Sequence, residues 1–202
     1  MKLSFAIAAL FGASAATPAL AYDINDWPTH YTFSDGTDIG VTLNYQYDIN
    51  DFSGDDGVLG EDISTNRRKE FGFTLKKKGV YDATAQFDFQ SRQWLDVFLR
   101  LETKALFGAD YGKLRFGYSK TPVGFEGITS ARAPSFLETA LPVQAVFAGR
   151  RTGIDWALER PNYILNFGYY FSQDLQGDND GTMIGGRFAW TAVKADGHVL
   201  HL

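Results

Sequence analysis

Apolar and polar residues alternate one for one between Asp38 and Asn50. The apolar positions are Ile39, Val41, Leu43, Tyr45, Tyr47 and Ile49. Successive side chains of a strand point to opposite faces, so this pattern predicts a β-strand with one apolar and one wet face. The pattern recurs in segments of about ten residues, the length that a tilted strand needs to cross a bilayer. The further predicted strands are residues 67–77, 81–90, 94–102, 112–120, 151–159, 163–171 and 183–192, with the start of a ninth at 199–202.

The connections between these strands differ in length at the two ends. Three connections at one end are long (51–66, 121–150 and 172–182), whereas none at the other end exceeds about nine residues. Outer-membrane barrels have short periplasmic turns and longer outer loops. A soluble Greek-key sandwich would distribute long crossovers over both ends. We therefore predict an all-β fold, an antiparallel transmembrane β-barrel with eight to nine strands in this chain.

Charges on the apolar side of the strands provide a second test. A Lys or Arg on a lipid face at the bilayer midplane costs about 2 to 4 kcal/mol. The four cations that share the apolar parity are all near strand ends, namely Lys69, Lys77, Lys120 and Arg160. The pattern fits a membrane barrel, although a soluble sandwich also keeps charges off its core face.

The N-terminus predicts export. Lys2 precedes an apolar run from Leu3 to Phe11, and the segment ends in Ala19-Leu20-Ala21. This is typical of a secretory signal peptide, and the run is too short for a transmembrane helix. We expect a signal peptide at residues 1–21 and a barrel domain at residues 22–202, located in an outer membrane.

Composition and charge exclude several other functions. The chain has no Cys, which excludes disulfides and thiolate metal sites. Basic residues are scattered along the strands with acidic residues between them, so we expect no nucleic-acid partner. No nucleophile elbow, Gly-rich phosphate loop or zinc-binding helix motif occurs, so we expect neither enzymatic activity nor a cofactor or metal.

A series of short motifs gives the chain a family resemblance. The motifs are Arg67-Arg68, Lys113–Gly117 followed by Pro122–Glu126, Thr129-Ser130, Phe136–Glu138, Gly149–Ile154 and Gly197–Leu202. In order and spacing they resemble the phosphate-selective porins O and P of Gram-negative outer membranes. The resemblance implies a sixteen-stranded, homotrimeric barrel in lipid, of which this chain would be about the N-terminal half. A separately closed eight-stranded barrel is the alternative.

The same resemblance implies an anion path lined by Arg and Lys, with the third outer loop, Thr121 to Arg150, folded inward. Strand parity places seven cations and seven carboxylates inward, so the inward cations could instead pair with carboxylates and stiffen the wall. The candidate anion-pathway residues are Arg67, Arg68, Arg100, Lys113, Arg115, Lys120, Arg132, Arg150, Arg151 and Arg187. Gly127 and Thr139 depart from the family pattern, which tends to place a Lys and an Arg there.

The sequence thus predicts a passive diffusion channel with a preference for small anions such as phosphate. A surface adhesin or structural scaffold built on the same barrel is the alternative, with the acidic loops as its working part.

Overall fold

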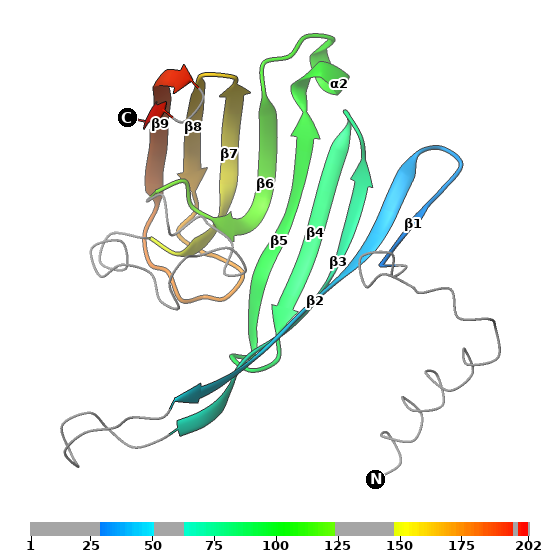
Figure 1. The fold of residues 1–202 in the computed structure, drawn as a ribbon, viewed down its shortest axis with the longest axis vertical. Coiled ribbons are helices and arrows are strands. Elements are labelled where there is room, and N and C mark those ends of the chain that lie inside the picture. The colour runs from blue at the N-terminus through cyan, green and yellow to red at the C-terminus, as the bar shows by residue number, and fades with distance from the viewer. Residues whose placement is uncertain (1–28, 51–62, 124–147, 196–197, 202) are drawn as a thin grey trace.

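The computed structural model describes residues 29–50, 63–123, 148–195 and 198–201 as one antiparallel sheet of ten strands (Figure 1). Every strand pairs with its neighbours in sequence, and the order runs from β1 to β10 without a crossover. The strands are β1 (His30–Thr32), β2 (Thr37–Asn50), β3 (Ile63–Lys77), β4 (Tyr81–Asp88), β5 (Gln93–Glu102), β6 (Lys113–Lys120), β7 (Arg150–Arg160), β8 (Tyr163–Tyr170), β9 (Met183–Ala195) and β10 (His198–His201). The all-β antiparallel prediction is confirmed, and the sheet is not closed.

The outer face of the sheet is apolar because the register aligns the apolar files of adjacent strands. Ile39 lies opposite Leu75, and Leu43 lies opposite Phe71. These side chains are not packed into a core: Leu43 is 69% exposed, and Ile184 on β9 is 67% exposed. Within the described residues only three hydrophobic side chains are buried, namely Leu95, Tyr118 and Tyr170. A face that leaves this much apolar surface uncovered requires an apolar environment.

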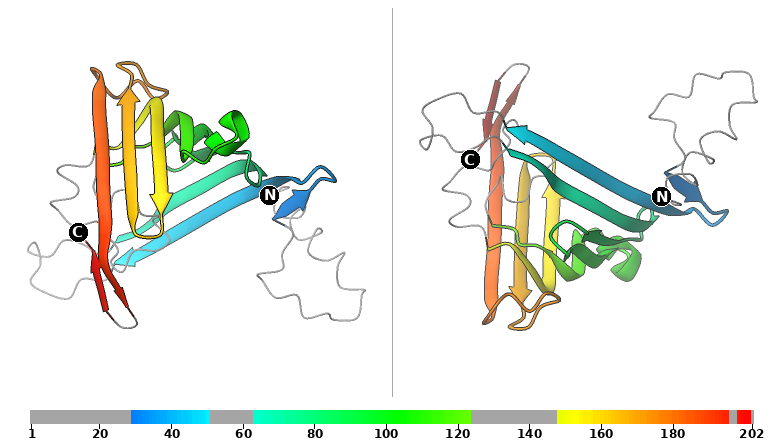
Figure 2. Two further views of the ribbon diagram at one scale, coloured as in Figure 1. Left: turned by 90° about the horizontal axis from the view of Figure 1, so that it is seen from above. Right: turned by 90° about the horizontal axis from the view of Figure 1, so that it is seen from below.

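The inner face of the sheet is polar and sheltered. Glu70 and Asp155 are each only 7% exposed. The sheet is bent, and Figure 2 shows β2–β4 and β7–β9 as its two arms. Side chains converge on the concave side of a curved sheet and diverge on the convex side. The concave side is therefore the polar one, since it brings charges of non-adjacent strands together.

Connections at one end of the sheet are short. β3 joins β4 through residues 78–80, and β7 joins β8 through residues 161–162. The short helix α2 (Thr103–Phe107) stands between β5 and β6. No helix among the described residues is long and apolar enough to cross a membrane.

Two of the four cations that share the apolar parity form ion pairs at this short-turn end. Lys77 Nζ lies 3.2 Å from Asp35 Oδ2, and Arg160 Nη1 lies 3.1 Å from Asp110 Oδ2. Asp35 accepts hydrogen bonds from the backbone N–H and the hydroxyl of Thr37. These bonds, and after them Lys77, lower the pKa of the Asp35 carboxyl to about 2.

Candidate functional site

Three ion pairs on the inner face join directly opposite residues of adjacent strands. Arg100 Nε lies 2.8 Å from Asp82 Oδ2, and Lys113 Nζ lies 3.4 Å from Glu102 Oε1. Arg115 contacts Asp155 Oδ2 through Nη2 at 2.7 Å and through Nε at 2.8 Å. Each pair joins residues that lie directly opposite each other in the register.

Phe98 lies between two of these cations. Its ring centroid is 5.9 Å from Arg100 Cζ and 5.5 Å from Arg115 Cζ. Arg100 and Arg115 are also opposite each other on β5 and β6. Like charges at this spacing repel, so the aromatic face and the two carboxylates are what allow both guanidinium groups to share the inner wall. The sequence contains a signal for Phe98, because it is an aromatic residue at a polar position between Asp96 and Arg100.

A β-bulge brings Arg67 and Arg68 to the same face. Gln46 pairs with Arg68 and Tyr47 pairs with Asn66, so Arg67 is the extra residue of β3. Arg67 Nη1 lies 3.1 Å from Asp48 Oδ2, and Arg68 Nη1 lies 3.0 Å from Glu70 Oε1. Strict alternation would have sent one of the two arginines to the outer face.

Glu70 accepts hydrogen bonds from side chains of three strands in this part of the inner face. Besides Arg68, it accepts hydrogen bonds from Asn44 Nδ2 at 2.9 Å and Gln86 Nε2 at 3.1 Å. Three donors from three strands hold a buried carboxylate in place, which compensates the cost of burying its charge. Asn44 and Gln86 were not among the predicted site residues.

The end of β6 and the start of β7 leave the wall together and turn across the inner face. We call residues 118–123 and 148–150 the stem. Its strands pair at Lys120 and Arg150, and Thr121 N donates to Gly149 O at 3.0 Å. Arg115 Nη2 donates to Lys120 O at 3.0 Å, so the stem lies over an inner-face side chain of its own strand. The turn occurs at Gly117, whose φ is +128°.

The stem gathers charges from distant strands. Arg150 Nε on β7 lies 3.1 Å from Asp96 Oδ1 on β5. Lys120 is within electrostatic range of Arg150, Asp96, Arg68 and Glu70. Strict alternation places Lys120 on the apolar face. This prediction is wrong: the bend at Gly117 turns the end of β6 inward, so Lys120 lies on the inner side. The result is a cluster of three cations and two carboxylates.

The remaining predicted residues have different surroundings. Arg151 donates to the carbonyl oxygens of Gly181 at 2.9 Å and Asp180 at 3.3 Å, so it ties the 171–182 connection to β7. Among the described residues Arg187 has no ion-pair partner, and its Nε is buried without a hydrogen-bond acceptor. Arg132 lies outside the described residues.

The 171–182 connection is folded back onto the strands. Gln176 Nε2 donates to Trp94 O at 2.9 Å, and Asn179 Nδ2 donates to Arg150 O at 3.1 Å. Burial alone would raise the pKa of Asp174, but hydrogen bonds from Asn179 and the N–H groups of Gly177 and Gln176 outweigh it and lower that pKa. The connection therefore carries an ionised carboxylate close to the stem.

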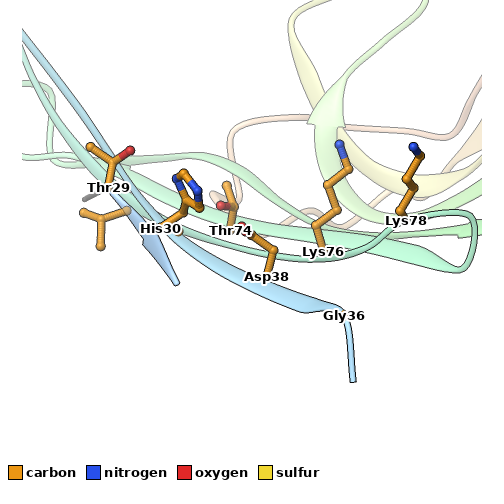
Figure 3. Close-up of a pocket in the computed structure, with 9 residues that line it drawn as sticks. Thr29, His30, Gly36, Asp38, Thr74, Lys76 and Lys78 are labelled. Atoms are coloured by element: carbon orange, nitrogen blue, oxygen red, sulfur yellow. The ribbon is translucent and has the colours of Figure 1, made fainter. Parts of the chain in front are cut away.

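A hollow of about 430 Å³ lies at the opposite end of the inner face, near the short turns. Lys76, Lys78, His30, Asp38 and Thr74 are among the residues that line it. Figure 3 shows the ammonium groups of Lys76 and Lys78 pointing the same way.

An antiparallel sheet with an apolar outer face and a charged, concave inner face is the wall of a porin-type β-barrel. The family model of the phosphate-selective porins O and P matches residues 39–202, and the chain belongs to this family. Proteins of this family are outer-membrane porins, which are channels rather than enzymes, so the Gram-negative outer membrane is their location. No curated protein and no solved structure gives a significant match to the chain.

Proposed function

We propose that this chain lines a passive diffusion channel that prefers anions, phosphate among them. The observation that carries the proposal is the cluster at the stem, where the three cations Lys120, Arg150 and Arg68 lie with the carboxylates of Asp96 and Glu70. The five charges sum to +1. A net positive charge at a narrow, weakly screened point attracts anions by electrostatic focusing.

The ion pairs of the inner wall support the same function. Their cations are partly open to solvent, with Arg100 37% and Lys113 32% exposed. A passing anion can therefore contact a guanidinium or ammonium group without first breaking its pair.

The lipid contact in this proposal rests on the apolar outer face of the sheet, whereas the trimer rests on the family resemblance and the export on the N-terminal sequence. The apolar outer face contacts outer-membrane lipid, and the channel is a homotrimer exported by the signal peptide at residues 1–21. Arg67, Arg68, Arg100, Lys113, Arg115, Lys120, Arg150, Arg151 and Arg187 are the described candidates for the anion path. No described feature favours an adhesin or scaffold role.

A planar-bilayer recording on the full chain tests the proposal. In a salt gradient, the zero-current potential should indicate anion preference, and phosphate on one side should reduce chloride conductance. Lys120→Glu combined with Arg150→Glu should reverse the preference, because the cluster then changes from +1 to −3. Lys104→Glu is a matched control, since Lys104 is an exposed residue of α2. Cation preference of the unmodified protein would overturn the proposal.

A further inference from the structure

Four inner-face glycines follow one another across β6 to β9. Gly117 on β6 lies opposite Gly153 on β7, and Gly168 on β8 lies opposite Gly185 on β9. They remove side-chain volume from the region over which the stem passes. Gly117 serves the bend itself, because its φ of +128° is rarely adopted by other residues.

Tyr170 fills the space that two of these glycines leave. A Cβ added at Gly168 would lie 2.8 Å from Tyr170 Cζ, and one added at Gly153 would lie 2.7 Å from Tyr170 Cδ1. The ring therefore lies flat against the strands. Its residue is 0% exposed, although it stands on the inner face near the end of β8. Something must cover the ring from the inner side.

The stem lies close to this ring. Ser119 is 1% and Thr121 is 0% exposed. A Cβ added at Gly185 would lie 3.5 Å from Val123 Cγ2 and 3.9 Å from Tyr170 Cε2. Figure 1 shows the end of β6 turning and its continuation running past β7 and β8 toward β9. Val123 of the stem thus reaches the far side of the glycine row.

We propose that Gly153, Gly168, Gly185 and Tyr170 form a seat for the stem, and that this seat holds Lys120 and Arg150 inside the channel. The four are positioning residues: they carry no charge and determine selectivity through where the stem lies. The inference rests on the proposed function and goes beyond it, because it assigns anion selectivity partly to uncharged residues of the wall.

Gly185→Val tests the seat. The Cβ of alanine at this position would lie 3.1 Å from Met183 Cε, the end of a flexible side chain that can move aside, and 3.5 Å from Val123 Cγ2. The branches of valine extend further and should push Val123 and the stem off the wall. We expect single-channel conductance to rise several-fold and anion preference to fall, with Gly185→Ala close to the unmodified protein. Gly186→Val is the matched control, since Gly186 is on the other face and its nearest atoms are Asn166 O at 3.0 Å and Phe167 Cδ2 at 3.7 Å.

A second set of variants applies if Gly185→Val does not fold, as judged by heat-modifiable migration on a gel. Val123→Ala shortens the stem side chain that contacts the seat, and Tyr170→Ala removes the ring. Both should raise single-channel conductance and lower anion preference, as Gly185→Val does. Tyr170→Phe keeps the ring and should leave both quantities unchanged. The chain has no Cys, so Lys120→Cys introduces a single thiol. Its modification rate by a charged thiol reagent should change when Gly185→Val is added.

Three outcomes decide between the two proposals. Folded Gly185→Val and Tyr170→Ala channels with unmodified conductance, selectivity and thiol reactivity would overturn the seat. An unmodified channel without anion preference would overturn the proposed function, while the thiol reactivity would still report the position of the stem. Change in the seat variants but not in Gly186→Val would establish the seat.

Discussion

The strand pairs β2–β3 and β6–β7 both place charged side chains on the inner face, but they do so in different ways. β2 and β3 run for 14 and 15 residues, and one bulge interrupts their register. β6 and β7 are shorter, with 8 and 11 residues, and their paired glycines let both chains turn away from the wall. The first pair stays in the wall of the sheet, and its inner-face ion pairs form within β3 or between β2 and β3. The second carries charges across the inner face to meet β3 and β5, so bending a strand gathers charges that alternation keeps apart.

The bend at Gly117 can be broken by one methyl group. In Gly117→Ala the new Cβ would lie 2.3 Å from Val97 O, and the backbone would keep a left-handed φ of +128°. We expect a loss of at least about 3 kcal/mol of unfolding free energy, or no folded channel, from the clash and the strain together. Urea unfolding in lipid vesicles measures the loss.

Gly36→Ala is the control for that experiment. Gly36 also has a positive φ, +79°, but a Cβ there would meet no atom within 4 Å. We expect a cost of about 1 kcal/mol from the backbone conformation alone. Equal losses in the two variants would contradict the claim that close packing at the bend matters.

Ion pairs of the inner wall and of the rim should differ in strength. Asp155→Ala leaves Arg115, which is 20% exposed, without its carboxylate, and should cost about 2 kcal/mol. Asp110→Asn keeps an acceptor for the N–H of Gly112 and removes the charge of the rim pair with Arg160, whose two side chains are 56% and 32% exposed, and should cost less than about 0.5 kcal/mol. Chemical unfolding of the two variants compares them. A larger loss at the rim would be the contrary result.

The smallest effect is a pH dependence at the turn between β1 and β2. The pKa of Asp35 is lowered from 3.8 to about 2, so its interactions stabilise the fold above pH 3.8 and are lost as the pH falls toward 2. A carboxyl titration by NMR should give a midpoint near 2. In Lys77→Ala the midpoint should rise only slightly, because the bonds from Thr37 are the larger cause. A midpoint near 3.8 in the unmodified protein would contradict the described turn.

Alternation predicted most of the strands because each outer position needs lipid and each inner position needs water. Residues 112–120 and 163–171 were expected as strands, and β6 and β8 begin and end within one residue of these bounds. The three-residue strand β1 was missed, since a short, polar, exposed segment has no periodic signal. The ion pairs followed from parity as one of two alternatives, and they form at Arg68, Arg100, Lys113 and Arg115. The pair of Arg150 with Asp96 did not follow from parity, because Arg150 was assigned to the 121–150 connection.

The positions at which the strands depart from strict alternation could not be predicted from the sequence. The bulge at Arg67 leaves the apolar pattern around it unchanged, so only the pairing partner reveals which residue is extra. Gly117 and Gly153 were visible as glycines within strands, which can mark a bend or a close backbone approach. The position of Lys120 depends on a turn in space that no one-dimensional period encodes. The permeation roles of these residues stay predictions.

The bulge in β3 separates the tip of the strand from its apolar segment. Beyond it, Asn66 faces outward and accepts a hydrogen bond from the Tyr45 hydroxyl at 2.7 Å, while the apolar file from Phe71 to Leu75 keeps its phase. One inserted or deleted residue at this point resets the pattern of the strand tip without disturbing the segment embedded below. A change of length at this bulge therefore alters the tip of the strand and leaves the register of the apolar segment from Phe71 to Leu75 unchanged.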